Sequence, residues 1–197
     1  MMDVITHYDH LIDIGNDPVL DPQPLKDYMD KWDGDLFIEL LSPQKHMTAL
    51  EIGCGSGRLL LKTAPLLAHV TGIDISPKTV QRACQNVSYN NVNVICGDFL
   101  TYDFDTRFDI IYSSLTFMHI KEKSLAAEKI FSLLNNGGRL VLSTDKNPDH
   151  KIDMGDYSVE IYPDSPDKML PVLQNAGFCN IKIHETEMAF IFVAQRP

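Results

Sequence analysis

The sequence lacks long hydrophobic runs and paired cysteines. No apolar stretch in its 197 residues approaches the roughly 20 residues of a transmembrane helix, and residues 1–7 lack the basic and apolar segments of a signal peptide. Its four cysteines, Cys54, Cys84, Cys96 and Cys179, lie far apart without a C-x-x-C pair, which argues against disulfides and zinc sites. We expect a cytoplasmic protein with reduced thiols, no membrane association and no bound metal.

Basic residues are also scarce. The chain has 17 Lys and Arg against 27 Asp and Glu, a net charge of −10, and no basic cluster offsets it. Such a surface repels polyphosphates, so we expect no nucleic-acid partner. The length suits a single domain over residues 1–197, and nothing in the sequence specifies an oligomeric state.

The N-terminal segment, residues 1–46, is rich in aspartate and predicts a helical cap. Apolar residues recur with helical spacing, which indicates a short helix at 8–14 and a helical stretch at 25–41 that Asp33-Gly34 interrupts. Its nine aspartates are interpreted as a solvated helix surface rather than a metal site. Tyr8 and Trp32 either anchor the cap on the core or line a lid over a substrate.

The stretch Ala49–Leu61 (ALEIGCGSGRLLL) predicts a strand, a tight turn and a helix. Three alternate glycines allow backbone angles closed to other residues, and the amides that begin the helix point at the space beside the turn. A dinucleotide fingerprint, G-x-G-x-x-G, would need a third glycine where Arg58 stands. The G-x-G-x-G turn after Glu51 instead suits a ligand with an ammonium and a carboxylate.

The run Glu51-x-Gly53-Cys54-Gly55-x-Gly57 resembles the glycine-rich motif of class I S-adenosylmethionine (SAM) dependent methyltransferases. Within that class it is similar to the small-molecule type, namely the methyltransferase domain families 11 and 25. The resemblance extends over about residues 47–145. It implies that Glu51 and the three glycines surround the methionine end of SAM. Cys54 belongs to the same loop, as a small residue tolerated in a tight turn rather than a reactive thiol.

Acidic residues follow two of the predicted strands. Asp74 closes the strand 69–74, about 20 residues past the glycines, where a carboxylate can accept hydrogen bonds from both ribose hydroxyls. Its alternative role as a helix cap is weakened because Ser76 already supplies the cap. The resemblance further implies that Ile75, Asp98 and Phe99 contact the adenine, although Asp98 could instead stabilise a turn.

The strand 108–112 and the segment after it are expected to face both cofactor and substrate. By resemblance, Ser113 lies near the sulfonium. The Asn/Asp-Pro-Pro-aromatic motif of enzymes that methylate nucleobases or glutamine is absent here, which disfavours those acceptors. His119 is the candidate general base, or a structural histidine at a helix start.

The remaining sequence, residues 146–197, is expected to hold an acceptor-side insertion and a C-terminal hairpin. Residues 146–156 predict a loop and 157–162 an added strand, with Asp145, His150 and Tyr157 as candidate pocket residues beside Tyr8 and Trp32. The strand 188–195 is apolar on both faces and should lie inside the sheet. The fold class is therefore α/β: a doubly wound, Rossmann-like sheet of seven strands in the family's order 3-2-1-4-5-7-6, the last strand antiparallel.

The expected function is transfer of a methyl group from SAM to a small molecule by in-line displacement, which depends mainly on positioning. If the acceptor needs a base, His119 is the first candidate and Asp145 or His150 the next. Arg58 either pairs with the cofactor carboxylate or lies on the surface. Two alternatives stay open: a non-catalytic SAM-binding protein, and a nicotinamide-dependent oxidoreductase, which Arg58 disfavours.

Overall fold

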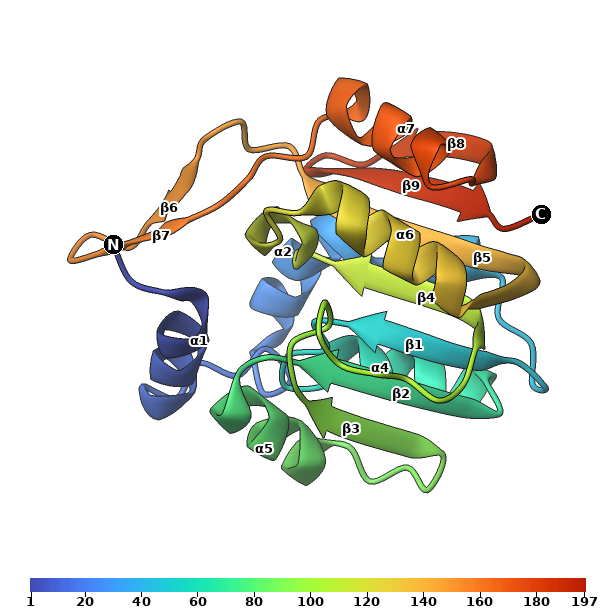
Figure 1. Ribbon diagram of the computed structural model, residues 1–197. Helices are drawn as coiled ribbons and strands as arrows, with labels where there is room; N and C mark the ends of the chain where they lie inside the picture. Colours follow the sequence, from blue (N-terminus) through green and yellow to red (C-terminus); the bar gives the residue numbers. More distant parts are fainter.

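The computed structural model describes residues 1–197, and its centre is a seven-stranded sheet (Figure 1). The strands are β1 (Thr48–Ile52), β2 (His69–Asp74), β3 (Val92–Cys96), β4 (Phe108–Ser114), β5 (Leu134–Asp145), β8 (Cys179–Glu185) and β9 (Ala189–Gln195). Their order is β3-β2-β1-β4-β5-β9-β8. The first five are parallel, and β9 is antiparallel to β5. The predicted order is confirmed once the separate ribbon β6–β7 is left out of the numbering.

Helices cover both faces of this sheet. They are α1 (Val4–Asp13), α2 (Gln23–Asp33), α3 (Asp35–Leu41), α4 (Arg58–Thr63), α5 (Pro77–Asn86), α6 (Lys123–Leu133) and α7 (Pro166–Asn175), with short 3₁₀ turns η1 (Ala64–Leu66) and η2 (Phe117–His119). Helices α6 and α7 contribute to one apolar cluster, and α3 and α4 to the other. In β4, Ile111 joins the first cluster while Ile110 and Tyr112 join the second, because successive side chains point to opposite faces.

Strand β9 lies between β5 and β8, as its sequence predicted. Ile191, Phe192 and Ala194 are completely buried. Apolar residues on both faces of a strand suit an interior position, where helices cover both sides. The more polar β8 occupies the edge.

The cap consists of three helices, and its central break lies where the sequence indicated. Gly34 separates α2 from α3, and a Cβ there would meet the carbonyl oxygen of Asp30 at 2.6 Å. Helix α1 begins four residues before the predicted start because Asp3 caps it: Oδ1 accepts from Thr6 N at 3.0 Å. Helix α5 ends at Asn86.

The predicted loop at 146–156 was partly wrong. It contains β6 (Lys151–Asp153), which pairs with β7 (Ser158–Glu160) in an antiparallel ribbon. The ribbon projects from the sheet toward α1, and Met2 bridges to Val159 (Figure 1). Insertion and N-terminus therefore meet on the side to which the arrowheads of β1, β2 and β4 point.

None of the helices is long and apolar enough to cross a membrane.

Candidate active site

A cavity of about 590 Å³ lies at the carboxyl ends of the central strands. Residues of the glycine loop, the ends of β2 and β3, the segment after β4 and the cap helix α1 line it. In a parallel sheet this edge collects the loops that bind ligands. The cavity joins parts of the chain from Val4 to Tyr162.

Two glycines of the loop are required for different reasons. Gly53 has φ of +73°, and a Cβ there would overlap the side chain of Thr116, so the segment after β4 can approach the loop closely. Gly57 has φ of +97°, and its Cβ would collide with Val87 after α5. Gly53, Cys54 and Gly55 line the cavity, whereas Gly57 does not and instead lets α4 and α5 pack.

Asp74 lies in the cavity wall next to Ile75 and braces the glycine loop. Its Oδ2 accepts from Gly55 N and its Oδ1 from Ser76 N, both at 2.9 Å. Burial raises the pKa of Asp74, and the hydrogen bonds from Ser76 and Gly55 partly oppose this. Ser76 itself caps α5, since its Oγ accepts from Thr79 N at 3.2 Å, so helix capping is not the role of Asp74.

Asp98 and Phe99 also line the cavity, at the end of β3. Oδ1 of Asp98 accepts from Leu100 N at 2.8 Å, which is the turn that the sequence left open as an alternative. Phe99 is 6% exposed and belongs to the apolar core below the cavity. Its ring therefore forms a fixed apolar wall.

Glu51 is a buried carboxyl group at the base of the cavity, 3% exposed. Tyr112 donates to its Oε2 at 3.0 Å, and Thr63 Oγ1 lies 2.8 Å from the Tyr112 hydroxyl. Burial raises the pKa of Glu51 well above its ordinary value, and the hydrogen bond from Tyr112 only partly opposes this. A cationic group placed beside Glu51 would favour its ionised form.

Cys54 is not a reactive thiol. It is 3% exposed, and burial, with Glu51 and Asp74 nearby, raises the pKa of its thiol well above the ordinary value. Because only the thiolate is nucleophilic, this environment keeps the sulfur inert.

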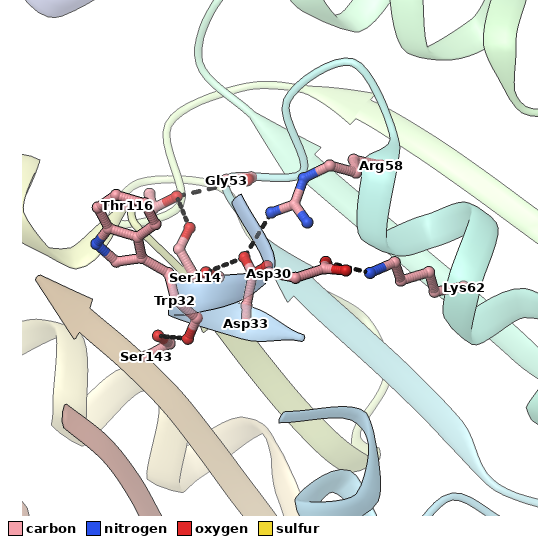
Figure 2. Close-up of polar contacts among 9 residues, drawn as sticks. All are labelled: Asp30, Trp32, Asp33, Gly53, Arg58, Lys62, Ser114, Thr116 and Ser143. Carbon is pink, nitrogen blue, oxygen red and sulfur yellow. Dashed lines mark hydrogen bonds and ion pairs between the residues drawn. The ribbon is translucent and has the colours of Figure 1, made fainter. Parts of the chain in front are cut away.

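Arg58 forms a buried ion pair with the cap (Figure 2). Its Nη2 lies 2.5 Å from Oδ2 of Asp33, which also accepts from Ser114 Oγ at 2.5 Å. Burial disfavours the charged form of Arg58, but Asp33 more than offsets this, and the net effect raises the pKa of Arg58. Arg58 and Ser114 line the cavity, whereas Asp33, completely buried, supports them from outside.

The expectation that Ser113 faces the cofactor is corrected. Its side chain is completely buried and donates to the Ile52 carbonyl oxygen at 2.8 Å, so it joins β4 to β1 instead of lining the cavity. The lining residues here are Ser114, Leu115 and Thr116. Alternation along the strand places neighbouring serines on opposite sides, and a one-residue error exchanges them.

His119 meets Tyr8 of the cap in the cavity wall. The Tyr8 hydroxyl lies 2.8 Å from His119 Nε2, and His119 Nδ1 is buried without a partner. Burial lowers the pKa of His119 to about 4, with His7 and Lys123 adding to the effect. Burial also raises the pKa of Tyr8, so both side chains are neutral at pH 7.

Four of the five expected pocket residues lie elsewhere. Trp32 donates to Asp145 Oδ2 at 3.1 Å and anchors α2 on the sheet, and Asp145 lines a separate cavity of about 220 Å³. Tyr157 lies 3.1 Å from His7 Nδ1, and His150 is exposed. Only Tyr8 lines the large cavity; Tyr162, which the sequence did not indicate, lines it as well.

Only some of the cap aspartates form the solvated surface that we expected: Asp3, Asp13, Asp27 and Asp35 are exposed, whereas Asp17 and Asp33 are buried. Asp17, 2% exposed, accepts from Ser56 Oγ at 2.7 Å in the glycine loop and from Asn86 Nδ2 at 3.0 Å in α5. Asp9, Asp13, Asp30 and Asp33 also contact the core, through Ser76, Lys78, Lys62 and Arg58 respectively. Sequence periodicity could not reveal this, because a helix face docked by charge has the same composition as a solvated one.

Comparison with known proteins places these features in a family. The model Methyltransf_31, described as a methyltransferase domain, matches residues 43–186. The chain belongs to this family. The expected methyltransferase family and the expected Rossmann-like fold class are confirmed.

Two curated proteins are similar to this chain in sequence, and one solved structure is similar to it in fold. Malonyl-[acyl-carrier protein] O-methyltransferase of Priestia megaterium is 32% identical over 106 residues, 52% of this chain and 38% of that protein. Phosphoethanolamine N-methyltransferase of Triticum aestivum is 29% identical over 175 residues, 81% of this chain and 33% of that protein. The solved complex of DhpI with S-adenosylhomocysteine (SAH) has a TM-score of 0.78 at 16% identity and covers 98% of this chain and 94% of its own. The chain thus spans well under half of the length of each of the two sequence relatives.

Proposed function

We propose that the domain binds SAM in the large cavity and transfers its methyl group to a small, neutral acceptor, for which a hydroxyl group suits the site best. The observation that carries this proposal is that one cavity holds carboxyl groups at the ends of β1, β2 and β3 and, in its wall, the neutral pair Tyr8–His119. In this arrangement Asp74 would accept from the ribose, Asp98 from the adenine amino group, and Ile75 and Phe99 would enclose the ring.

The charge of the cavity supports a cationic ligand. Glu51 and Arg58 would receive the ammonium and carboxylate groups of the methionine end, and Nη1 of Arg58 is buried without a partner. SAM carries a net positive charge because its sulfonium adds to a zwitterion. The charged residues that line the cavity are four acidic ones, Glu51, Asp74, Asp98 and Glu122, against two basic ones, Arg58 and Lys121, and this acidic excess favours a cation.

The neutral Tyr8–His119 pair supports the acceptor class. A base with a pKa of about 4 is too weak to deprotonate an ammonium group before attack. An attacking hydroxyl becomes strongly acidic as it gains the methyl group, so His119 can take its proton at that stage. Transfer leaves SAH, a neutral thioether, and the enzyme holds nucleophile, methyl carbon and sulfur in line.

The test combines binding and turnover. Calorimetry should detect SAM and SAH but not NADH, and a panel of small alcohols and amines should reveal SAH release with a hydroxyl acceptor. His119→Gln should lower kcat about 100-fold, as for loss of a general base, while SAH affinity stays within twofold. The matched control, His150→Gln, changes an exposed histidine outside the cavity and should leave kcat unchanged. Absence of SAM and SAH binding by the folded chain would contradict the proposal.

A further inference from the structure

We propose that Asp33, a residue of the cap, is a positioning residue for the amino-acid end of the cofactor: it holds the Arg58 guanidinium so that Nη1 stays available to a carboxylate and away from Glu51. This inference rests on the proposed SAM site, but it concerns a residue outside the cavity wall. It makes cofactor affinity depend on the docking of the cap.

The geometry connects Asp33 to two walls of the cavity. It is the last residue of α2, and its Oδ2 receives both Arg58 Nη2 and Ser114 Oγ at 2.5 Å (Figure 2). Arg58 begins α4 behind the glycine loop, and Ser114 ends β4. A single carboxylate from the cap therefore fixes two lining residues that lie 56 positions apart in the sequence.

The unsatisfied atoms indicate where a ligand belongs. Nη1 of Arg58 and Oδ1 of Asp33 are buried without hydrogen-bond partners, and each such group carries a desolvation penalty. Arg58 lines the cavity, so a ligand carboxylate there would accept the hydrogen bonds that Nη1 of Arg58 lacks. Paired N–H groups of one guanidinium can serve two carboxylates at once.

Glu51 supplies the competing partner. Arg58 and Glu51 are close enough for their charges to influence each other's ionisation. Without the charge of Asp33, the guanidinium would be drawn toward Glu51, which would neutralise the group proposed for the ammonium. Loss of Asp33 should thus impair both halves of the amino-acid site while leaving the adenosine end intact.

Helix α2 provides a matched control. Asp30 pairs with Lys62 of α4 at 2.8 Å, but these side chains are 38% and 34% exposed and neither lines the cavity. In Figure 2 the two ion pairs run side by side from the cap to α4. Asp30→Asn therefore removes a cap-to-α4 charge pair outside the cavity wall, and the charge of Asp30 affects Arg58 less than those of Asp33 and Glu51 do.

The experiment compares two ligands by calorimetry. SAH carries the amino-acid end, and 5′-methylthioadenosine lacks it. We expect Asp33→Asn to weaken SAH binding at least tenfold and 5′-methylthioadenosine binding less than twofold, whereas Asp30→Asn changes neither by more than twofold. Arg58→Lys, which keeps the charge but loses the fork, should show the same selective loss of SAH affinity, and thermal unfolding verifies that each variant is folded.

Two outcomes would overturn the inference, and a third would refute the proposed function on which it rests. Equal weakening of both ligands by Asp33→Asn would assign Asp33 to holding the cap alone. Unchanged SAH affinity in Asp33→Asn, or in Arg58→Lys if Asp33→Asn fails to fold, would remove this pair from cofactor binding. A wild-type chain that binds neither ligand would instead refute the proposed function itself, which distinguishes the two failures.

Discussion

Different kinds of interaction stabilise the sheet and hold helix α1 of the cap in place. In the sheet, neighbouring strands β5 and β9 bury residues such as Leu140, Leu142 and Phe192 completely. In α1 only His7 is buried, and the helix meets α5 through polar contacts, including Asp9 Oδ1 with Ser76 Oγ at 2.7 Å. Apolar burial is insensitive to salt, whereas exposed charge pairs are screened. The sheet, together with α3, whose Phe37 and Leu41 are buried in the core, can therefore stay folded while the docking of α1 changes with ionic strength.

Exposed apolar side chains sharpen this contrast. Seven of the twelve exposed large hydrophobic residues lie within the first 46 positions: Met1, Ile5, Ile14, Leu20, Leu25, Tyr28 and Leu36. The apolar residues that suggested helices in the cap thus contribute less to the core than their spacing implied. Asp17, Trp32 and Asp33 hold the cap by polar contacts at buried positions.

The largest expected effect separates the two regions by stability. Phe192→Ala removes a completely buried side chain from β9 and should lower the free energy of unfolding by about 3–5 kcal/mol. Leu25→Ala in α2, where the side chain is 49% exposed, should change it by less than about 0.5 kcal/mol. Urea denaturation of both variants checks this, and similar losses would contradict the division into sheet and cap.

The stability of the protein should depend on pH through His119, which contacts Tyr8 of the cap. Its pKa falls from 6.5 to about 4 on folding, so between these values the unfolded state binds more protons and stability rises with pH. As the pH falls from 7 to 4, the wild type should lose up to about 3 kcal/mol more than His119→Gln. Denaturation of both proteins at pH 7, 5.5 and 4 measures the difference; parallel curves would mean that His119 titrates normally.

On the side of the sheet, Asp74→Ala should weaken SAH binding by about 1–3 kcal/mol, as for loss of a buried hydrogen-bond partner. The glycine loop also loses its acceptor for Gly55 N, so both contact and support are removed. Calorimetry checks this, with Asp98→Ala as a comparison at the next strand. An unchanged affinity in Asp74→Ala would exclude Asp74 from the site.

The smallest effect concerns docking of the cap. The pair Lys78–Asp13 has side chains 45% and 52% exposed, and such pairs contribute little and are screened by salt. Trypsin should cut after Lys26, Lys31 or Lys45 about two- to threefold faster at high salt than at low salt, and bound SAH should slow cleavage. Equal rates under all three conditions would show that charge does not control the cap.

The comparison of expected and observed elements shows which signals act locally. The strand at 69–74 and the break at Gly34 match the structure, because period, breakers and caps operate within a few residues. The run of apolar residues on both faces that placed β9 inside the sheet is a signal of the same local kind. Errors of this local kind were small, as at the start of α1.

The sequence by itself determined the glycine loop and the carboxyl groups at the ends of β2 and β3, because each follows from backbone geometry over a few residues, while the strand order was implied by the family resemblance and is confirmed. Only the tertiary structure decided that Tyr8 meets His119, that Trp32 binds Asp145 instead of lining a pocket, and that Ser114 rather than Ser113 faces the cavity. Those outcomes depend on pairings across 111 and 113 residues and on one step of strand register. The local sequence does not distinguish an aspartate that is solvated from one, such as Asp33, that forms an ion pair with a distant part of the chain.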